Sequence, residues 1–150
     1  MADLPIRCDT VSVVVLRKAA RWETLLLLRT QPPLSWSQIA GGIEEGERAV
    51  DTARRELREE TGLAPDALYT ADWHEAFYEP ERERLSLVPV FVAIVSADAT
   101  VTLNAEHADY RWLTLAEALE TVSFSGQRAM LRHVTAEFVD RQPSALQRLD

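Results

Sequence analysis

Gly41-Gly-Ile-Glu-Glu-Gly-Glu47 and Arg55-Glu-Leu-Arg-Glu-Glu-Thr-Gly-Leu63 are the stretches that decide the fold of this chain. With U standing for an aliphatic residue, they form the pattern G-x5-E-x7-R-E-U-x-E-E-x-G-U without a gap. Seven fixed residues of average usage would match by chance in about one chain of this size in a million. The spacing is therefore specific enough to predict both local structure and chemistry.

The second half of this pattern is expected to be a helix over residues 47 to about 61. An apolar stripe lies within one arc of roughly 100° around such a helix, and it consists of Ala49, Val50, Ala53 and Leu57. Gly62 is expected to end the helix, because glycine is the usual residue just past a helix C-terminus.

Three glutamates share one side of the last turn, because Glu56, Glu59 and Glu60 are spaced i, i+3 and i+4. Carboxylates are unfavourable there by about 0.3–1 kcal/mol each, since a helix C-terminus prefers cations. A bound divalent cation would offset this cost, and carboxylates are ligands that Mg²⁺ or Mn²⁺ prefers. For E-x-x-E-E alone, a solvated charged helix would be the better interpretation. The preceding glycines favour a site, because Gly41 and Gly42 let the backbone approach a metal or phosphate closely.

The composition indicates one acidic domain. The 150 residues are enough chain for a single hydrophobic core. With 16 basic and 24 acidic residues the net charge is -8, which makes duplex DNA and anionic membranes poor partners. An acidic site can still bind a polyphosphate when metal ions mediate the contact. A monomer and a homodimer are both consistent with the sequence.

Neither a targeting signal nor a disulfide is expected. Met1–Pro5 lacks the basic start and the apolar run of a signal peptide, and no apolar stretch is long enough to span a bilayer. Cys8 is the only cysteine, which excludes an internal disulfide and a cysteine metal cluster. We therefore expect a cytoplasmic protein.

Strands are expected on both sides of the central helix. β-Branched and leucine-rich runs predict them at 10–16, 23–30, 36–40, 68–78, 85–95 and 106–112. Pro89 indicates an edge strand or a bulge, and a capping box at Thr114–Glu117 begins a helix. With a final helix from Ser125, this order predicts an α/β/α sandwich around a mixed β-sheet. One domain over 1–150 is expected, with its core at about 10–140 and a loosely held tail after 143.

The pattern at Gly41–Leu63 is the Nudix box, and the chain resembles the Nudix hydrolases, which hydrolyse a nucleoside diphosphate linked to another group. The lead-in Leu28–Gly42 and the strand Glu106–Trp112 extend the resemblance to roughly residues 10 to 140. It implies the Nudix fold, an α/β/α sandwich with a central mixed sheet. It also implies a hydrolase acting on phosphoric anhydride bonds with Mg²⁺, or alternatively Mn²⁺, as cofactor. The partner that the resemblance implies is a small diphosphate or triphosphate substrate.

The resemblance assigns roles to residues of the box. Glu56 and Glu60 match metal ligands, and Glu59 matches either a ligand or the general base. The Gly41 carbonyl matches a group that completes the metal site. Arg55 matches the residue that orients the glutamates without touching substrate.

Further candidates lie at the edges of the box or outside it. Glu106 matches an additional metal-binding glutamate, with an exposed strand-end charge as the alternative. Arg29 suits a phosphate contact, although a surface arginine capping its strand is equally consistent. Arg7 is a weaker candidate of the same kind, and Gly42 offers close backbone approach to substrate. Structural or exposed roles are expected for the three histidines, His74, His107 and His133.

The mechanism implied is attack of water on phosphorus, with metal ions neutralising the diphosphate and lowering the pKa of bound water. A carboxylate or a second metal ion takes the proton, and the candidate carboxylates are Glu59, Glu79, Glu81 and Glu83.

The residues at 36–47 and 106–112 resemble the branch that removes pyrophosphate from dihydroneopterin triphosphate. A pterin or nucleoside triphosphate is thus the first substrate expected, although Ala40 and the short loop 79–84 depart from that branch. One alternative is a nucleoside diphosphate-X hydrolase for ADP-ribose or a dinucleoside polyphosphate. Another is a non-catalytic ligand sensor.

Overall fold

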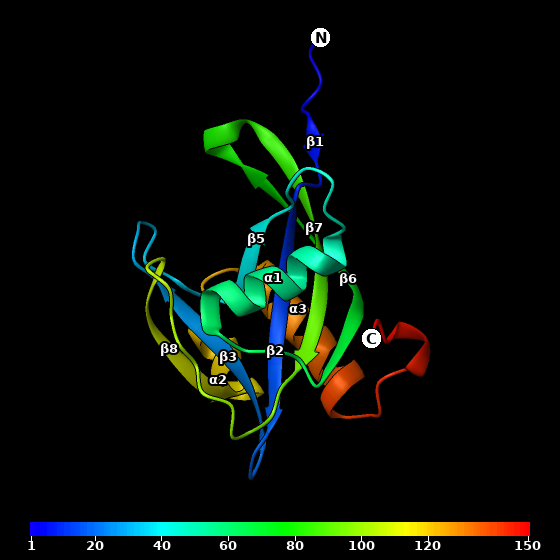
Figure 1. Cartoon of the computed structure of the whole chain (residues 1–150). Helices are drawn as coiled ribbons and strands as arrows, with labels where there is room; N and C mark the ends of the chain where they lie inside the picture. The colour runs from blue at the N-terminus through cyan, green and yellow to red at the C-terminus, as the bar shows by residue number, and fades with distance from the viewer.

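A mixed, eight-stranded β-sheet lies at the centre of the computed structural model, which describes all 150 residues (Figure 1). The strands are β1 (Ile6–Arg7), β2 (Thr10–Lys18), β3 (Trp22–Arg29), β4 (Trp36–Ser37), β5 (Ile39–Gly42), β6 (Ala67–Glu79), β7 (Arg84–Ile94) and β8 (His107–Thr114). The helices are α1 (Ala49–Thr61), α2 (Leu115–Thr121) and α3 (Ser125–Val134), with short helical turns η1 (Pro80–Arg82), η2 (Thr135–Val139) and η3 (Ala145–Gln147). None of these helices has the length and apolar character needed to span a bilayer.

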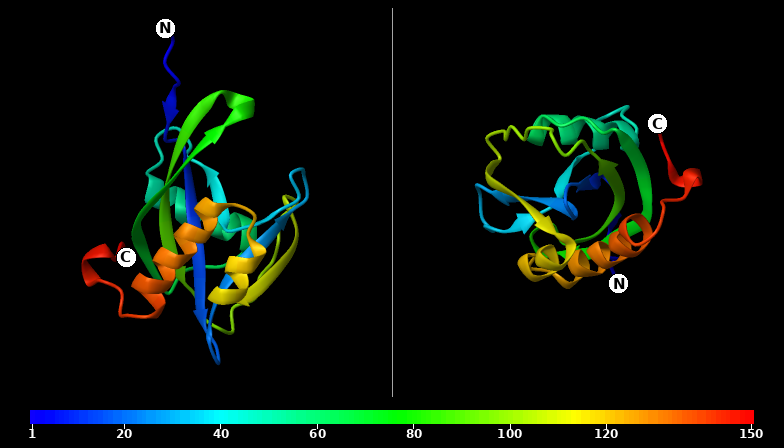
Figure 2. Two further views of the ribbon diagram at one scale, coloured as in Figure 1. Left: turned by 180° about the vertical axis from the view of Figure 1, so that it is seen from behind. Right: turned by 90° about the horizontal axis from the view of Figure 1, so that it is seen from below.

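Helices cover both faces of the sheet (Figure 2). Val11 and Val13 of β2 point to one face, where they pack in a cluster with Leu57 of α1. Val14 and Leu16 point to the other face, into a cluster that includes residues of α2 and α3. Such alternation is expected for a strand buried on both faces. The α/β/α sandwich and the mixed sheet predicted from the sequence are confirmed.

Strand β2 changes its antiparallel partner along its length. Residues Thr10 to Val13 pair with β5, whereas Leu16 to Lys18 pair with β3. Strand β3 in turn pairs with β4 and β8. The sheet therefore has two arms that meet at β2. The β5 arm is β5 with the first half of β2, and the β3 arm is β3, β4 and β8.

Two expected elements differ in detail. The strand expected over 36–40 is interrupted at Gln38, because the chain crosses there from β4 on the β3 arm to β5 on the β5 arm. Helix α1 begins at Ala49 rather than at Glu47. The Glu47 carboxylate accepts hydrogen bonds from the Glu44 N–H and from Arg55, and these bonds hold Glu47 in the preceding loop.

Strand β7 is an interior strand, with β1 and β2 on one side and β6 on the other. The edge interpretation of Pro89 is therefore wrong. Pro89 pairs with His74, next to an irregularity in β6 between Thr70 and His74, and Asp72 within it has a φ of 53°. The bulge interpretation is confirmed, since a bulge tolerates the missing N–H of proline.

The segment after Pro143 is held against β6. The Leu149 N–H donates to the Leu68 carbonyl at 2.8 Å, and the Leu68 N–H donates to the Asp150 carboxylate at 3.3 Å. Arg54 of α1 donates to the Leu149 carbonyl at 3.2 Å. Residues 144–150 are mostly exposed, but the free edge of β6 offers them these backbone partners.

Candidate active site

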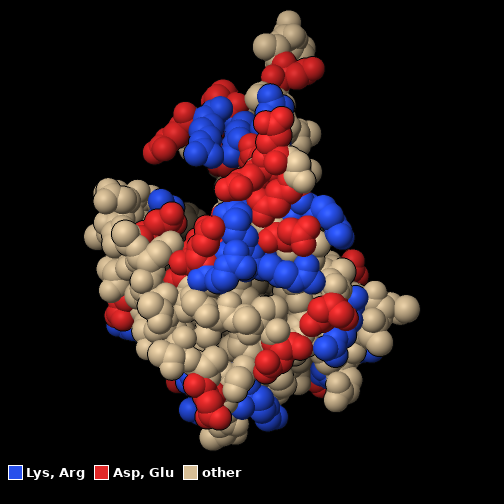
Figure 3. Space-filling view, viewed as in Figure 1, with Lys and Arg blue, Asp and Glu red and all other residues tan.

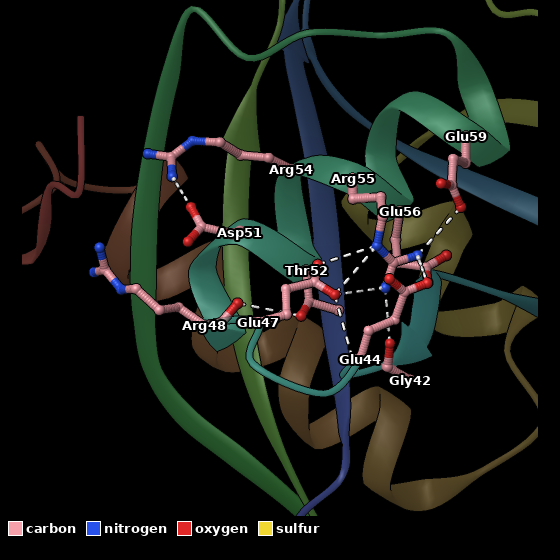
Figure 4. Close-up of polar contacts among 10 residues, drawn as sticks. All are labelled: Gly42, Glu44, Glu47, Arg48, Asp51, Thr52, Arg54, Arg55, Glu56 and Glu59. Carbon is pink, nitrogen blue, oxygen red and sulfur yellow. Dashed lines mark hydrogen bonds and ion pairs between the residues drawn. The ribbon is translucent and has the colours of Figure 1, made fainter.

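Arg55 lies at the centre of a network that fixes the glutamates of α1 and its leading loop (Figure 4). Its guanidinium donates to Glu47 at 3.0 Å, to Glu56 at 2.7 Å and to Glu59 at 3.2 Å. It also donates to the Gly42 carbonyl at 2.8 Å, which ties α1 to the β5 arm. These carboxylates, Glu47 first, raise the pKa of Arg55 above its usual value. The planar fork of arginine is suited to bridging several oxygens at once.

Glu56 lies against the backbone of Gly41. A Cβ atom at position 41 would overlap the Glu56 carboxylate, so Glu56 can occupy this place only while residue 41 is glycine. Burial raises the pKa of Glu56, and the hydrogen bond from Arg55 opposes the rise. The loop before α1 and the carboxylates on α1 are thus fitted to each other.

Glu60 is more deeply buried than Glu56, with 2% of its surface exposed. Its Oε2 atom has no hydrogen-bond partner. Burial raises the pKa of Glu60 to about 9; repulsion from Glu56 and Glu106 adds to the rise, and Arg29 opposes it. A buried carboxylate without a partner is costly unless a proton or a cation compensates it.

The β3 arm brings further charged groups to Glu60. Glu106 directly precedes β8, His107 begins β8, and Arg29 ends β3 opposite His107. Leu28 pairs with Asp109 whereas Arg29 pairs with His107, so β8 carries an extra residue at this point. Such bulges re-aim side chains next to functional sites. As a result one ligand atom each from Glu60, Glu106 and His107 lie within 4.8 Å of one another.

These residues line a cleft of about 440 Å³ between the two arms. Its wall is mostly polar and includes Arg29, Gln38, Ala40, Glu60, Glu106 and His107. Carboxylates beside an arginine are arranged to hold a cation and an anion together. The carboxylates of Glu60 and Glu106, with the partnerless Oε2 of Glu60, fit a hard divalent cation. Glu56 is close enough to raise the pKa of Glu60, but neither Glu56 nor Gly41 lines the cleft.

Other candidates from the sequence lie outside the cleft wall. Arg7 is exposed in β1, donates to the Ile6 carbonyl at 3.1 Å and does not line the cleft. Gly42 does not line it either, and its carbonyl is bonded to Arg55. Glu59 is 51% exposed at the end of α1, where it contacts Arg55.

The three glutamates of the β6–β7 hairpin are candidates for the base, but none of them lines the cleft. Glu79 accepts hydrogen bonds from Ser86 and Arg84, and the bond from Ser86 is the main cause of its lowered pKa. Glu83 accepts a hydrogen bond from the Tyr78 hydroxyl at 2.6 Å. Glu81 lies exposed at the tip of the hairpin. Glu59 is the candidate that lies beside the other glutamates of α1.

Sequence reasoning missed a buried polar network behind the cleft. The Gln38 amide donates to Ser12 at 2.9 Å and to Glu75 at 3.0 Å, and Gln127 of α3 donates to Gln38 at 3.4 Å. Burial raises the pKa of Glu75, with the Ser12 hydrogen bond opposing. No spacing in the sequence signals this network, because its members come from separate elements.

The position of His107 was also missed. Its ring lies on the cleft wall with two carboxylates, whereas a structural or exposed role was expected. Burial lowers the pKa of His107, Arg29 lowers it further and Glu106 opposes. The one sequence signal was its place directly after Glu106.

Acidic and basic side chains are interspersed on the α1 side of the molecule (Figure 3). They gather over α1 and the β6–β7 hairpin, whereas uncharged residues cover most of the surface below α1 in this view. No large basic surface is present on this face, as expected from the net charge of -8.

Comparisons with known proteins identify the family and the fold of this chain. Residues 7–134 match the NUDIX domain family. An octanoyltransferase of Myxococcus xanthus is 36% identical over 138 residues, covering 89% of this chain and 38% of that protein. The chain therefore spans less than half the length of this relative.

Two solved structures are similar in fold. The Caenorhabditis elegans Ap4A hydrolase, in a binary complex, has a TM-score of 0.79 and 26% identity, covering 90% of this chain and all of that one. The Escherichia coli dihydroneopterin triphosphate pyrophosphohydrolase has a TM-score of 0.71, covering 87% of this chain and 96% of that one. At 21% identity the second likeness shows the fold alone.

Proposed function

The chain belongs to the Nudix family, and on that premise we propose that it is a divalent-metal-dependent pyrophosphohydrolase acting on a nucleoside or pterin triphosphate. One observation carries the proposal. Glu60 and Glu106 line the same polar cleft as Arg29, so the cleft can hold a cation and a phosphate side by side. A polyphosphate bound with its metal ion needs both kinds of group.

The carboxylates proposed as metal ligands are Glu56, Glu60 and Glu106, with Glu59 and the Gly41 carbonyl as further candidates. The expected ion is Mg²⁺, or Mn²⁺ as the alternative. Bound there, the cation would supply positive charge to the phosphate oxygens and make water more acidic. The partnerless Oε2 of Glu60 supports this assignment, because it is a buried acceptor with no donor in the protein.

The remaining roles are proposed for residues around these carboxylates. Arg55 holds Glu47, Glu56 and Glu59 in place through its guanidinium. Arg29 binds a phosphate oxygen of the substrate, for which a guanidinium is well suited. Arg7 and Gly42 stay weaker candidates for substrate contact, because neither lines the cleft.

Glu59 is proposed as the group that accepts the proton of the attacking water. Its carboxylate is 51% exposed to solvent, and it lies 3.2 Å from the Arg55 guanidinium beside the other glutamates of α1. Water forms a bond to phosphorus, the bridging oxygen leaves with pyrophosphate, and the proton passes to the carboxylate. The products are a nucleoside or pterin monophosphate and pyrophosphate.

A dinucleoside tetraphosphate is the second candidate substrate. The similarity to the Ap4A hydrolase favours it, because that similarity extends over the full length of the solved chain. Off-centre cleavage of such a substrate would release a monophosphate and a triphosphate by the same attack of water.

A substrate panel tests the proposal. It contains the common dNTPs, dihydroneopterin triphosphate, ADP-ribose and diadenosine tetraphosphate, each with Mg²⁺ or Mn²⁺, and the products are separated by chromatography. Pyrophosphate released by the natural protein but not by Glu60→Gln would support the first candidate and choose between pterin and nucleotide. A monophosphate with a triphosphate would select the second. Absence of turnover on every substrate with both metals would overturn the proposal.

A further inference from the structure

An imidazole joins the carboxylates at the wall of the cleft. His107 is half-buried at the start of β8, opposite Arg29. One ligand atom each from His107, Glu60 and Glu106 lie within 4.8 Å of one another. Donor atoms around one cation are about 3–4 Å apart when the bonds are about 2.1 Å. Small side-chain rotations would therefore bring all three donors onto a single ion.

The state of Glu60 distinguishes this cluster from solvated surface charges. Only 2% of the surface of Glu60 is exposed to solvent, and its Oε2 atom has no hydrogen-bond partner. Water reaches it poorly, and the neighbouring side chains Glu56 and Glu106 are acceptors rather than donors. A buried acceptor facing other acceptors needs a proton or a cation between them, and one cation can compensate several carboxylates at once.

Asn104 selects which nitrogen of His107 can bind a metal. The Asn104 Oδ1 atom accepts the Glu106 N–H at 3.1 Å, which identifies it as the amide oxygen. The same oxygen lies 3.4 Å from His107 Nδ1, so Nδ1 carries the proton as the donor of this contact. The lone pair is then on Nε2. Histidines that ligate metals commonly donate their other N–H to a carbonyl oxygen in this way.

We propose that His107 is a nitrogen ligand of the cation held by Glu60 and Glu106, which gives the site a mixed nitrogen and oxygen donor set. Imidazole favours transition metals, whereas Mg²⁺ prefers oxygen alone. The mixed donor set would therefore favour Mn²⁺ or Co²⁺ over Mg²⁺. This preference would be larger than that of a site made of carboxylates alone. This inference rests on the metal site of the proposed function and adds a ligand and a metal preference to it.

Pulsed electron paramagnetic resonance of the Mn²⁺-loaded protein tests the inference without substrate. Coupling between Mn²⁺ and a histidine ¹⁴N is expected in the natural protein, and histidine labelled with ¹⁵N should shift it. The coupling should vanish in His107→Gln. It should persist in His74→Gln, the matched control, because His74 is exposed on β6 and does not line the cleft.

Calorimetric titration gives the second readout. His107→Gln is expected to weaken Mn²⁺ binding by about tenfold or more, because loss of even an outer-shell partner of a metal ligand typically lowers metal affinity by about 10–100-fold. Mg²⁺ binding should change by less than about threefold. Asn104→Ala keeps the imidazole but removes the oxygen that contacts its Nδ1 atom and orients the ring. This variant should therefore weaken the nitrogen coupling without abolishing it. This variant also serves if His107→Gln fails to fold, which circular dichroism would reveal.

The outcomes separate the inference from the proposed function. Nitrogen coupling that is absent from the natural protein, or unchanged in His107→Gln, would overturn the histidine ligand. If Glu60→Gln and Glu106→Gln nevertheless abolished Mn²⁺ binding, the metal site formed by the carboxylates would be supported, without His107 as a ligand. Equal metal binding by all of these variants would instead overturn the metal site itself.

Discussion

Gly41 and Glu56 are in such close contact that no side chain fits at position 41 without displacing the Glu56 carboxylate. Gly41→Ala is therefore expected to move Glu56 rather than to strain the backbone, since position 41 has no positive φ. Misplacement of a catalytic group by about 1 Å can cost about 100-fold in rate, and we expect a loss in kcat of that order. Steady-state kinetics on the substrate found by the panel would measure it.

Gly126→Ala is the control for this substitution. Nothing lies within 4 Å of a Cβ built at Gly126, and alanine favours the helix there. Activity should be unchanged and stability slightly raised. A rate loss in Gly126→Ala equal to that in Gly41→Ala would contradict the steric explanation.

Glu60→Gln should abolish metal-dependent turnover yet stabilise the protein when metal is absent. Folding raises the pKa of Glu60 from 4.5 to about 9, so its contribution to stability is fully present below about pH 4.5. That contribution is lost as the pH rises toward 9, because above about pH 4.5 the unfolded chain ionises this carboxyl whereas the folded chain must keep it protonated. Glutamine stays neutral throughout. In a chelator, the melting temperature of Glu60→Gln should exceed that of the natural protein at about pH 8, and the gap should close near about pH 5.

Adding Mg²⁺ or Mn²⁺ should reverse this order. The ion compensates the carboxylate in the natural protein, which gains stability by binding, whereas the glutamine variant gains little. Identical melting curves for the two proteins at every pH, with and without metal, would show that burial of Glu60 does not destabilise the fold and that Glu60 is not a metal ligand.

Arg55→Ala is expected to lower kcat more than it raises KM, because Arg55 positions carboxylates and does not line the cleft. Its side chain is 17% exposed, so loss of its bonds should also cost about 1–3 kcal/mol of unfolding free energy. Arg55→Lys should recover only part of kcat and only part of the unfolding free energy, since lysine lacks the planar guanidinium that bridges several oxygens.

Arg58→Ala is the control that tests whether loss of any arginine from α1 lowers kcat as Arg55→Ala does. Arg58 is exposed, and its side chain makes neither an ion pair nor a hydrogen bond. Kinetic constants should stay within about twofold of the natural protein, as is usual for surface substitutions. A KM increase alone in Arg55→Ala would point to direct substrate contact instead of positioning.

Arg29→Ala and Arg7→Ala should differ sharply. Arg29 lines the cleft and is proposed to bind phosphate, so its removal should raise KM by about tenfold or more, the worth of one charge-assisted hydrogen bond. Arg7 lies outside the cleft and its removal should leave KM unchanged. Equal effects of the two substitutions in steady-state kinetics would mean that the substrate extends to β1.

Local signals in the sequence predicted the sheet, the two helical layers and the glutamate helix. The β-branched run of β2 and the apolar stripe of α1 are short-range patterns, and each favours one kind of element. The capping box at Thr114–Glu117 is likewise present in the structure. Such signals depend only on neighbours along the chain.

The features that sequence reasoning missed depend on contacts between distant segments. The bulge near Arg29 and His107 places an imidazole beside Glu60, but no residue near His107 specifies that bulge. Gln38 and Glu75 meet because β2 exchanges one partner for another, which no local pattern reports. The docking of residues 144–150 on β6 is a third such contact, since its partners lie in the middle of the chain.

The docked tail has a consequence for the behaviour of the chain at high concentration. An open strand edge is a template on which another molecule can add a strand. Leu68 would present its N–H and carbonyl in this way if Leu149 and Asp150 did not bond to them. The last residues thus cover part of an open strand edge, and we expect their removal to promote aggregation of molecules that are otherwise folded.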